Sequence, residues 1–130
     1  MALSGEFYTS GYEGRCWKFS WSASQNIGNN TSTISYKVEA VGGSAGWYMT
    51  GPCKVVVAGG EVYNNTGRWK QYVGTLTSGS VTVNHNDNGT ASFSASISSA
   101  IYYYADGTGN GSGTWSLDTI PRASQPSVNT

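Results

Sequence analysis

Apolar and polar residues alternate along several short runs of this chain, and this alternation constrains the fold more than any other feature. From Ala91 to Ser98 every second residue is apolar, and each residue between is a serine. The same period of two runs from Arg15 to Ala23 and from Ser32 to Val41. Because successive side chains of a strand point to opposite faces, each run predicts a β-strand with one buried and one solvated face.

Further short runs, separated by Gly, Asn and Asp, predict the remaining strands. They cover residues 47–49, 53–57, 61–63, 68–76, 80–85, 101–105 and 114–120. Gln25–Thr31 has the composition of a polar loop, and Asp87-Asn88-Gly89 predicts a tight hairpin turn, because Asn-Gly tolerates positive φ angles. No segment has the periodicity of an amphipathic helix. Roughly eight to ten short strands predict an all-β, antiparallel β-sandwich of the jelly-roll or Ig-like kind.

Composition favours the same fold. The chain has ten Val and five Ile but three Leu, and β-branched side chains suit a pleated, half-buried surface. Its 5 Trp, 9 Tyr and 3 Phe provide enough apolar area for a core. At 130 residues the chain has the length of one domain, which we expect to cover residues 1–120. The segment 121–130 (PRASQPSVNT) is typical of a linker or C-terminal tail.

Charged residues are few and balanced, with seven basic and seven acidic side chains. No run of Lys or Arg is present that would neutralise a row of phosphates, so we expect no nucleic-acid partner. No stretch is long and apolar enough for a transmembrane helix, and the first residues lack the basic and apolar regions of a signal peptide. We therefore expect no membrane partner.

The residue types that carry catalytic chemistry are scattered along the chain. His85 is the single histidine and stands beside a turn, where we expect its ring to bond to loop backbone. Cys16 and Cys53 do not form a zinc motif with it, and we expect free, buried thiols, with one disulfide as the alternative. We expect no catalytic residue, no metal, no cofactor and hence no enzyme. Two options stay open: a glycoside hydrolase with two carboxylates about 5 to 10 Å apart, and calcium bound by the oxygen-rich loops 84–88 and 106–110.

The number of aromatic residues exceeds what a core of this size needs. A two-sheet domain of this length buries roughly six to eight aromatic side chains. Trp21, Tyr36, Phe93 and Trp115 stand at alternating apolar positions and are predicted to lie in the core. The others form a surplus, whose members are Trp47, Tyr48, Tyr63, Trp69 and Tyr102 to Tyr104. Within Trp47-Tyr48 and within Tyr102 to Tyr104, at least one ring must point away from the core.

Exposed aromatic rings stack on the C–H faces of sugar rings, and neighbouring polar side chains bind the sugar hydroxyls. The surplus therefore predicts a carbohydrate-binding site. Its stacking candidates are Trp47, Tyr48, Trp69 and Tyr104, and its hydroxyl-binding candidates are Arg68 and Asp106. The alternative is that these rings pack against loops or against a neighbouring domain.

Four segments of the chain resemble modules of the minor structural and tail proteins of siphophages and prophages of Gram-positive bacteria. They are SASQNIGNNTSTI at Ser22–Ile34, VTVNHNDNGTA at Val81–Ala91, GTWSL at Gly113–Leu117 and DTIPRAS at Asp118–Ser124. The resemblance spans nearly the whole chain in order. These motifs are strand-and-turn signatures, so the resemblance assigns a role to no single residue.

The resemblance implies a β-sandwich within a baseplate, distal-tail or fibre protein of a virion. Such modules attach the virion to the cell-wall or surface polysaccharide of the host. The expected partners are therefore a cell-surface polysaccharide and other tail or baseplate domains, and the expected location is the virion, acting at the bacterial surface. The expected function is a non-catalytic carbohydrate-binding or adhesion module. The alternative is a purely structural spacer or protein-interaction module of the tail.

Overall fold

Ten β-strands make up the described part of the chain in the computed structural model, and no helix occurs there. The structure describes residues 2–11, 16–42, 47–49, 53–65, 69–71, 74–99 and 109–121, of which 47–49 and 69–71 are described as backbone. The strands are β1 (Ser4–Tyr8), β2 (Cys16–Asn26), β3 (Thr31–Val41), β4 (Trp47–Met49), β5 (Cys53–Val57), β6 (Gly60–Asn65), β7 (Trp69–Gln71), β8 (Gly74–Asn84), β9 (Ser92–Ser98) and β10 (Gly111–Ser116).

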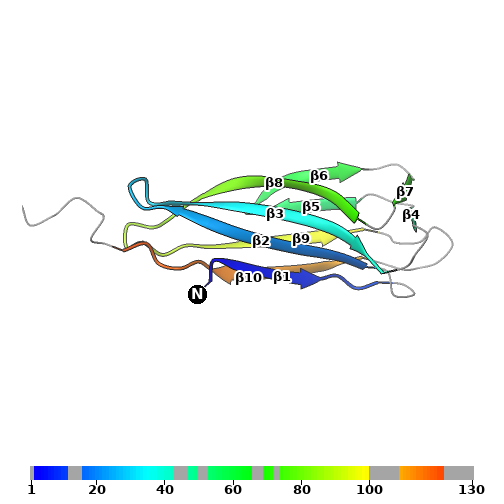
Figure 1. The fold of residues 1–130 in the computed structure, drawn as a ribbon, viewed down its shortest axis with the longest axis horizontal. Coiled ribbons are helices and arrows are strands. Elements are labelled where there is room, and N and C mark those ends of the chain that lie inside the picture. Colours follow the sequence, from blue (N-terminus) through cyan, green and yellow to red (C-terminus); the bar gives the residue numbers. More distant parts are fainter. Residues whose placement is uncertain are drawn as a thin grey trace, which may run out of the picture.

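Two four-stranded antiparallel sheets pack face to face and form an elongated sandwich (Figure 1). One sheet has the order β1-β2-β3-β8 and the other has the order β10-β9-β5-β6. The strands β4 and β7 form a separate two-stranded ribbon at one end of the long axis, and the β2–β3 turn lies at the opposite end (Figure 1). The predicted all-β antiparallel sandwich is therefore confirmed.

The alternation in the sequence determines which face of each strand is buried. Along β9, Phe93, Ala95 and Ile97 are buried, whereas Ser92, Ser94 and Ser98 are exposed. Along β3, the inward residues Ile34 and Val38 are completely buried. The faces predicted for these strands are confirmed, and so are those of β2.

Aromatic rings fill the centre of the space between the sheets. Phe19 of β2 stacks on Phe7 of β1 at 5.2 Å, on Trp115 of β10 at 6.0 Å and on Tyr36 of β3 at 6.3 Å between ring centroids. Trp21 meets Phe93 edge to face at 4.8 Å. Rings from both sheets therefore touch one another directly, which adds about 0.5–1.5 kcal/mol per pair to the stability from buried area.

On one long side of the sandwich, hydrogen bonds join the residues that flank the edge strands β1 and β10. The amide of Ala2 donates to the carbonyl of Ser116 at 2.9 Å, and the amide of Asp118 donates to the carbonyl of Ala2 at 3.1 Å. At the other end of these strands, the amide of Ser10 donates to the carbonyl of Asn110 at 2.9 Å. These bonds fasten the two ends of β1 beside the two ends of β10 and therefore link the two sheets.

Several boundaries predicted from the sequence are wrong. The run 68–76 is two strands, because β7 ends at Gln71 and β8 starts at Gly74, which has a φ of 136°. The loop expected at Gln25–Thr31 is shorter, since β2 continues to Asn26. The last strand, β10, covers Gly111–Ser116, so it starts three residues before the predicted range 114–120 and ends four residues before the end of that range. The strand β1 was not predicted. The predicted strand 101–105 and the tail from 122 lie outside the described residues.

The Asp87-Asn88-Gly89 turn is present, but it does not join a hairpin. Gly89 has a φ of 87°, and its amide donates to the carbonyl of Asn86 at 2.8 Å. The strands on either side, β8 and β9, belong to different sheets. The segment therefore crosses from one sheet to the other, and the hairpin prediction is wrong.

The close approach of Gly5 to two indole rings generates a stability prediction. A Cβ atom at Gly5 would lie 2.6 Å from Nε1 of Trp21 and 2.8 Å from Nε1 of Trp115. Overpacking of a rigid core costs about 1–3 kcal/mol. We therefore expect Gly5→Ala to lower the free energy of unfolding, measured by urea denaturation, by that amount.

Gly28→Ala is the matched control for this measurement. The atom nearest to a Cβ at Gly28 is Oδ1 of Asn26 at 3.7 Å, an ordinary contact. Its free energy of unfolding should remain within about 0.5 kcal/mol of the wild type. Equal stability of the two variants would contradict the packing described at Gly5.

Candidate functional site

The ribbon formed by β4 and β7 contains half of the predicted carbohydrate-binding positions. Its antiparallel register places Trp47 opposite Gln71, Tyr48 opposite Lys70 and Met49 opposite Trp69. These strands are separated by the β5–β6 hairpin along the chain, so their pairing is a product of the fold. The ribbon lies at one end of the sandwich (Figure 1).

The other three predicted site residues lie outside the described part of the chain. They are Arg68, Tyr104 and Asp106. The structure therefore brings together Trp47, Tyr48 and Trp69 as backbone positions of one ribbon. The use of all six as a site stays a prediction.

Aromatic side chains make up much of the core that the structure describes. Among the described residues, five aromatic residues are buried in the core, and three more are partly buried and packed against it. They are Trp17, Phe19, Trp21, Tyr36 and Phe93, followed by Phe7, Tyr63 and Trp115. The core positions predicted for Trp21, Tyr36, Phe93 and Trp115 are confirmed. The assignment of Tyr63 to the surplus is wrong, because its ring packs on the core and its hydroxyl accepts from Nδ2 of Asn65 at 3.5 Å.

His85 has the structural role that was expected from its place beside a turn. Its ring is buried, with Nδ1 2.6 Å from the carbonyl oxygen of Gly89 and Nε2 2.7 Å from Oγ of Ser32. The side chain of Asn30 bonds the carbonyls of His85 and Asn86 at 3.2 and 2.9 Å. Both ring nitrogens are within hydrogen-bond distance of a partner. The ring therefore links the start of β3 to the loop between β8 in one sheet and β9 in the other.

The two cysteines are free thiols in this structure. Cys53 is completely buried at the start of β5, and burial raises its pKa to about 12, against a weaker opposite effect of a hydrogen bond with Ser99. Burial also raises the pKa of the partly buried Cys16. The thiolate is the nucleophilic form of cysteine, so neither thiol is activated at neutral pH.

Charged side chains are sparse and lie at the surface of the described part of the chain. Two ion pairs lie on the outer face of the first sheet: Nζ of Lys18 is 3.7 Å from Glu6, and Nζ of Lys37 is 3.6 Å from Glu39. Among the described residues, no three of the His, Cys, Asp and Glu side chains are grouped as metal ligands. Within the same residues there is no helix that is long and apolar enough to cross a membrane.

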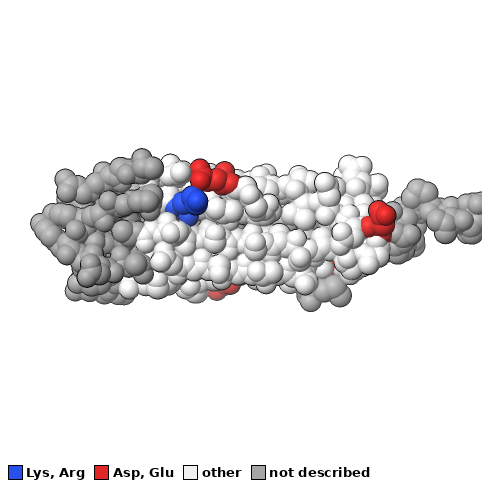
Figure 2. Space-filling view, turned by 180° about the vertical axis from the view of Figure 1, so that it is seen from behind, with Lys and Arg blue, Asp and Glu red and all other residues white. Residues whose placement is uncertain are grey.

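The outer face of β9 and β10, within the second sheet, is covered by hydroxyl groups. Across β9 and β10, the register pairs Ser92 with Ser116, Ser94 with Thr114 and Ser96 with Ser112. Figure 2 shows this side of the molecule, on which charged side chains occupy little of the described surface. Such a face can exchange hydrogen bonds with a neutral polar ligand and has little attraction for a charged one.

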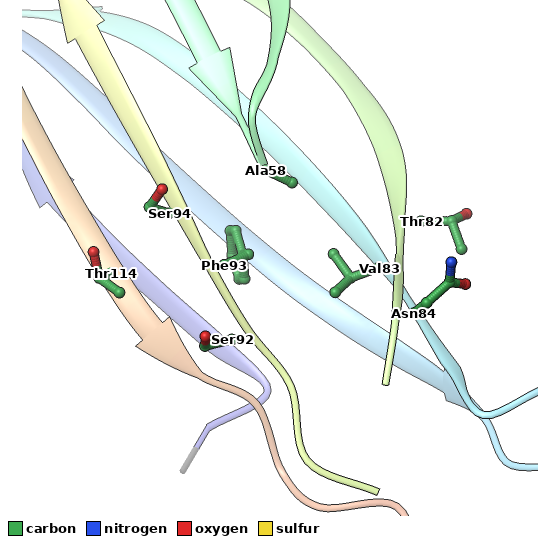
Figure 3. Close-up of a pocket in the computed structure, with 8 residues that line it drawn as sticks. All are labelled: Ala58, Thr82, Val83, Asn84, Ser92, Phe93, Ser94 and Thr114. Carbon is green, nitrogen blue, oxygen red and sulfur yellow. The ribbon is translucent and has the colours of Figure 1, made fainter. Parts of the chain in front are cut away.

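A groove that was not predicted from the sequence opens beside this face (Figure 3). It has a volume of about 500 Å³ and is lined by Ala58, Thr82, Val83, Asn84, Ser92, Phe93, Ser94 and Thr114. The groove lies where the β5–β9 ladder ends. Val57 is the last residue in register, opposite Ala95, and Ala58, with a φ of 53°, donates one further backbone hydrogen bond to the carbonyl of Ser94 at 2.8 Å. Figure 3 shows Val83 and Phe93 between the ribbons of β8 and β9, so an apolar floor lies among hydroxyl and amide groups. The volume lies in the range of small-molecule sites, roughly 300–1,000 Å³.

The alternation in the sequence marked the lining residues of β8 and β9 as strand residues. The end of β5 at Val57 agrees with the predicted strand 53–57, but no local pattern indicated that this end would lie beside Phe93 and leave a groove there. Comparisons of this chain with protein families, with curated proteins and with solved structures gave no match.

The contact between Ser32 and His85 generates a prediction about the role of this histidine. Ser32→Ala removes the partner of a buried ring nitrogen, which costs about 1–3 kcal/mol because the nitrogen loses its hydrogen bond without regaining water. We expect the urea midpoint to fall accordingly. Ser35→Ala is the control, because Ser35 is an exposed serine of the same strand. A midpoint equal to that of Ser35→Ala would contradict the described network.

The burial of Cys53 generates a prediction about thiol reactivity. In a Cys16→Ser variant, iodoacetamide at pH 8 should modify Cys53 at least about ten-fold more slowly in the folded protein than in guanidinium chloride, since both access and thiolate fraction are lowered. Mass spectrometry of timed samples measures the rate. Equal rates in the two solvents would show that the thiol is accessible and would contradict the core position.

Proposed function

We propose that this chain is a non-catalytic carbohydrate-binding module that attaches a phage tail or baseplate to polysaccharide on a bacterial cell surface. The observation that carries the proposal is the pairing of β4 with β7, which gathers Trp47, Tyr48 and Trp69 at one end of the sandwich. The phage setting is supported by the four segments between Ser22 and Ser124 that resemble tail-protein modules.

The composition of the core supports a binding role for the aromatic residues of the ribbon. Within the described part of the chain, eight aromatic side chains fill or border the core, a number already within the range that a domain of this size buries. Indole and phenol rings at the end of a sandwich provide flat platforms for the C–H faces of sugars. Trp47, Tyr48, Trp69 and Tyr104 are therefore the proposed stacking residues, with Arg68 and Asp106 as hydroxyl-binding partners.

The polarity of the described surface supports a neutral or weakly charged glycan. Hydroxyl and amide groups cover the outer face of β9 and β10 and line the groove beside them. Binding through such groups depends little on salt, since the electrostatic contribution that salt screens is small. We expect the apparent affinity to change less than about two-fold between 50 and 500 mM NaCl.

A shallow site of this kind binds each glycan weakly. We expect a dissociation constant in the range of about 10 µM to 1 mM per site. A virion displays many copies of its tail proteins, and linked sites raise the overall avidity by orders of magnitude. Weak single sites are therefore compatible with firm attachment.

The test is the binding of purified, fluorescently tagged domain to intact Gram-positive cells and to their extracted wall polysaccharides. Saturable binding that soluble polysaccharide competes away is expected. Trp47→Ala and Trp69→Ala should each weaken it at least about ten-fold, because loss of one stacked ring removes on the order of 1–3 kcal/mol, as it does for stacked bases. Incubation with the same polysaccharides should release no new reducing ends.

Ile27→Ala is the matched control, because it removes an apolar side chain from the surface at a different place. Ile27 is 46% exposed and belongs to the β2–β3 turn, at the end of the sandwich away from β4 and β7. Its substitution should leave binding unchanged, and circular dichroism should show all variants folded. Absence of binding across a broad panel, even for a multimerised domain, would instead favour the structural spacer. Release of reducing ends would favour a hydrolase.

A further inference from the structure

Three of the four edge strands of the sandwich are protected against pairing with another chain. The edges are β1 and β8 in one sheet and β10 and β6 in the other. Hydrogen bonds between the residues that flank β1 and β10 hold these two edges side by side, so each edge covers the other. The edge strand β6 is short and carries the exposed Glu61, and its ladder with β5 is interrupted by a bulge at Val55/Val56. Charges, bulges and short lengths are the usual devices that keep sheet edges from pairing.

The edge of β8 has none of these devices over the eight residues from Thr77 to Asn84. Their sequence, TSGSVTVN, contains no charged residue and no proline. The one irregularity of its ladder with β3 lies before this stretch, between Val38 and Glu39 of the partner strand. No strand in the described part of the chain pairs with the outer side of β8.

The backbone groups on this outer edge can be assigned from the register. The amide of His85 donates to the carbonyl of Asn30 at 2.9 Å, which continues the β3–β8 ladder. Because hydrogen-bonded and non-bonded pairs alternate in an antiparallel ladder, Val83 and Val81 bond to β3. The N–H and C=O groups of Ser80, Thr82 and their even-numbered neighbours then point outward, as a row of donors and acceptors with strand spacing.

We infer that β8 pairs with β8 of a second copy of this chain, antiparallel about a two-fold axis, in a register that places Ser80 opposite Ser80. This register is self-complementary, because it sets Thr82 of each copy opposite Ser78 of the other. From Ser78 to Thr82, the side chains that face each other on the outer surface are then neutral and hydroxylated, and no like charges are opposed. The two four-stranded sheets become one eight-stranded sheet.

The inner side of β8 fits the same register. Gly79 has no side chain, and a Cβ there would lie 2.7 Å from the hydroxyl oxygen of Tyr36, so the Tyr36 ring occupies the space beneath it. In the proposed register, Val81 of each copy lies opposite Gly79 of the other. Val81 and Val83 are partly buried in one copy, and a second strand alongside would cover them further. The pairing therefore covers apolar surface as well as backbone groups.

The first test is the mass of the protein in solution. Sedimentation equilibrium from about 5 µM to 1 mM should show a monomer–dimer equilibrium, since pairing along one edge gives an interface at the small end of the known range. Ser80→Lys sets two ammonium groups opposite each other and should weaken the dimer at least about ten-fold. Ser35→Lys is the matched control: it adds the same charge to an exposed serine that pairs with Ser80, but one strand inside the edge, and should leave the dimer unchanged.

A second variant separates loss of pairing from loss of folding. Thr82→Pro removes an outward N–H that bonds to no strand of its own sheet, and proline is tolerated at such edge positions. The variant should fold, with the circular dichroism spectrum of the wild type, and be monomeric. A dimer that survives both Ser80→Lys and Thr82→Pro would overturn the proposal, and so would a wild type that is monomeric at 1 mM.

Cross-linking tests the register itself. Under mild oxidation, Ser80→Cys should form a disulfide-linked dimer, because the proposed axis passes beside residue 80. Ser35→Cys should form at least about ten-fold less, and Cys16 and Cys53 of the wild type are present in both samples as the background. Equal cross-linking of the two variants would contradict this register. None of these measurements depends on glycan binding, so their outcome is separate from that of the proposed function.

Discussion

Phe19 stands at the centre of the contact between the two sheets, and the remaining architecture depends on that contact. Its ring stacks on Phe7 and Tyr36 within its own sheet and on Trp115 across the sandwich. A β-sheet with one apolar face is stable only when that face is covered. The ring stack provides this cover near the closed side of the sandwich, where the residues that flank β1 and β10 also share hydrogen bonds.

The groove and the open strand edge lie on the long side of the sandwich opposite the closed one. On that side β5 ends at Val57, the groove opens between β8 and β9, and the outer edge of β8 meets no other described strand. At the end of the long axis, the ribbon of β4 and β7 lies apart from both main sheets. The core depends on residues of both sheets, including Val55 and Val57 of β5, and Phe93 lines the groove as well as the core. The exposed side chains of the β8 edge, Ser80 and Thr82, are not part of it. Changes at those two positions are therefore compatible with an unchanged core.

The sequence predicted the buried faces well because period two is a local property. It failed at β1 because the inward position there is Gly5, whose missing side chain makes room for Trp21 and Trp115 and hides the alternation. It failed for Tyr63 because the bulge in the β5–β6 ladder changes which residues of β6 face inward. It also failed at the turn before β9, since local turn chemistry does not state which sheet the next strand joins. For the candidate site, counting aromatic residues indicated the surplus, but only the fold brings Trp47 and Trp69 into one ribbon.

The hydrogen bonds that close the sandwich join residues at opposite ends of the described chain. Ser10 bonds Asn110, and Ala2 bonds Ser116. Domains dominated by such distant contacts fold slowly, in roughly milliseconds to seconds, because the loop entropy must be lost before the contacts form. During synthesis on the ribosome, β1 must wait for β10 to emerge before this side can close. Until then the nascent chain has unsatisfied strand edges, and it is in this interval that aggregation competes with folding.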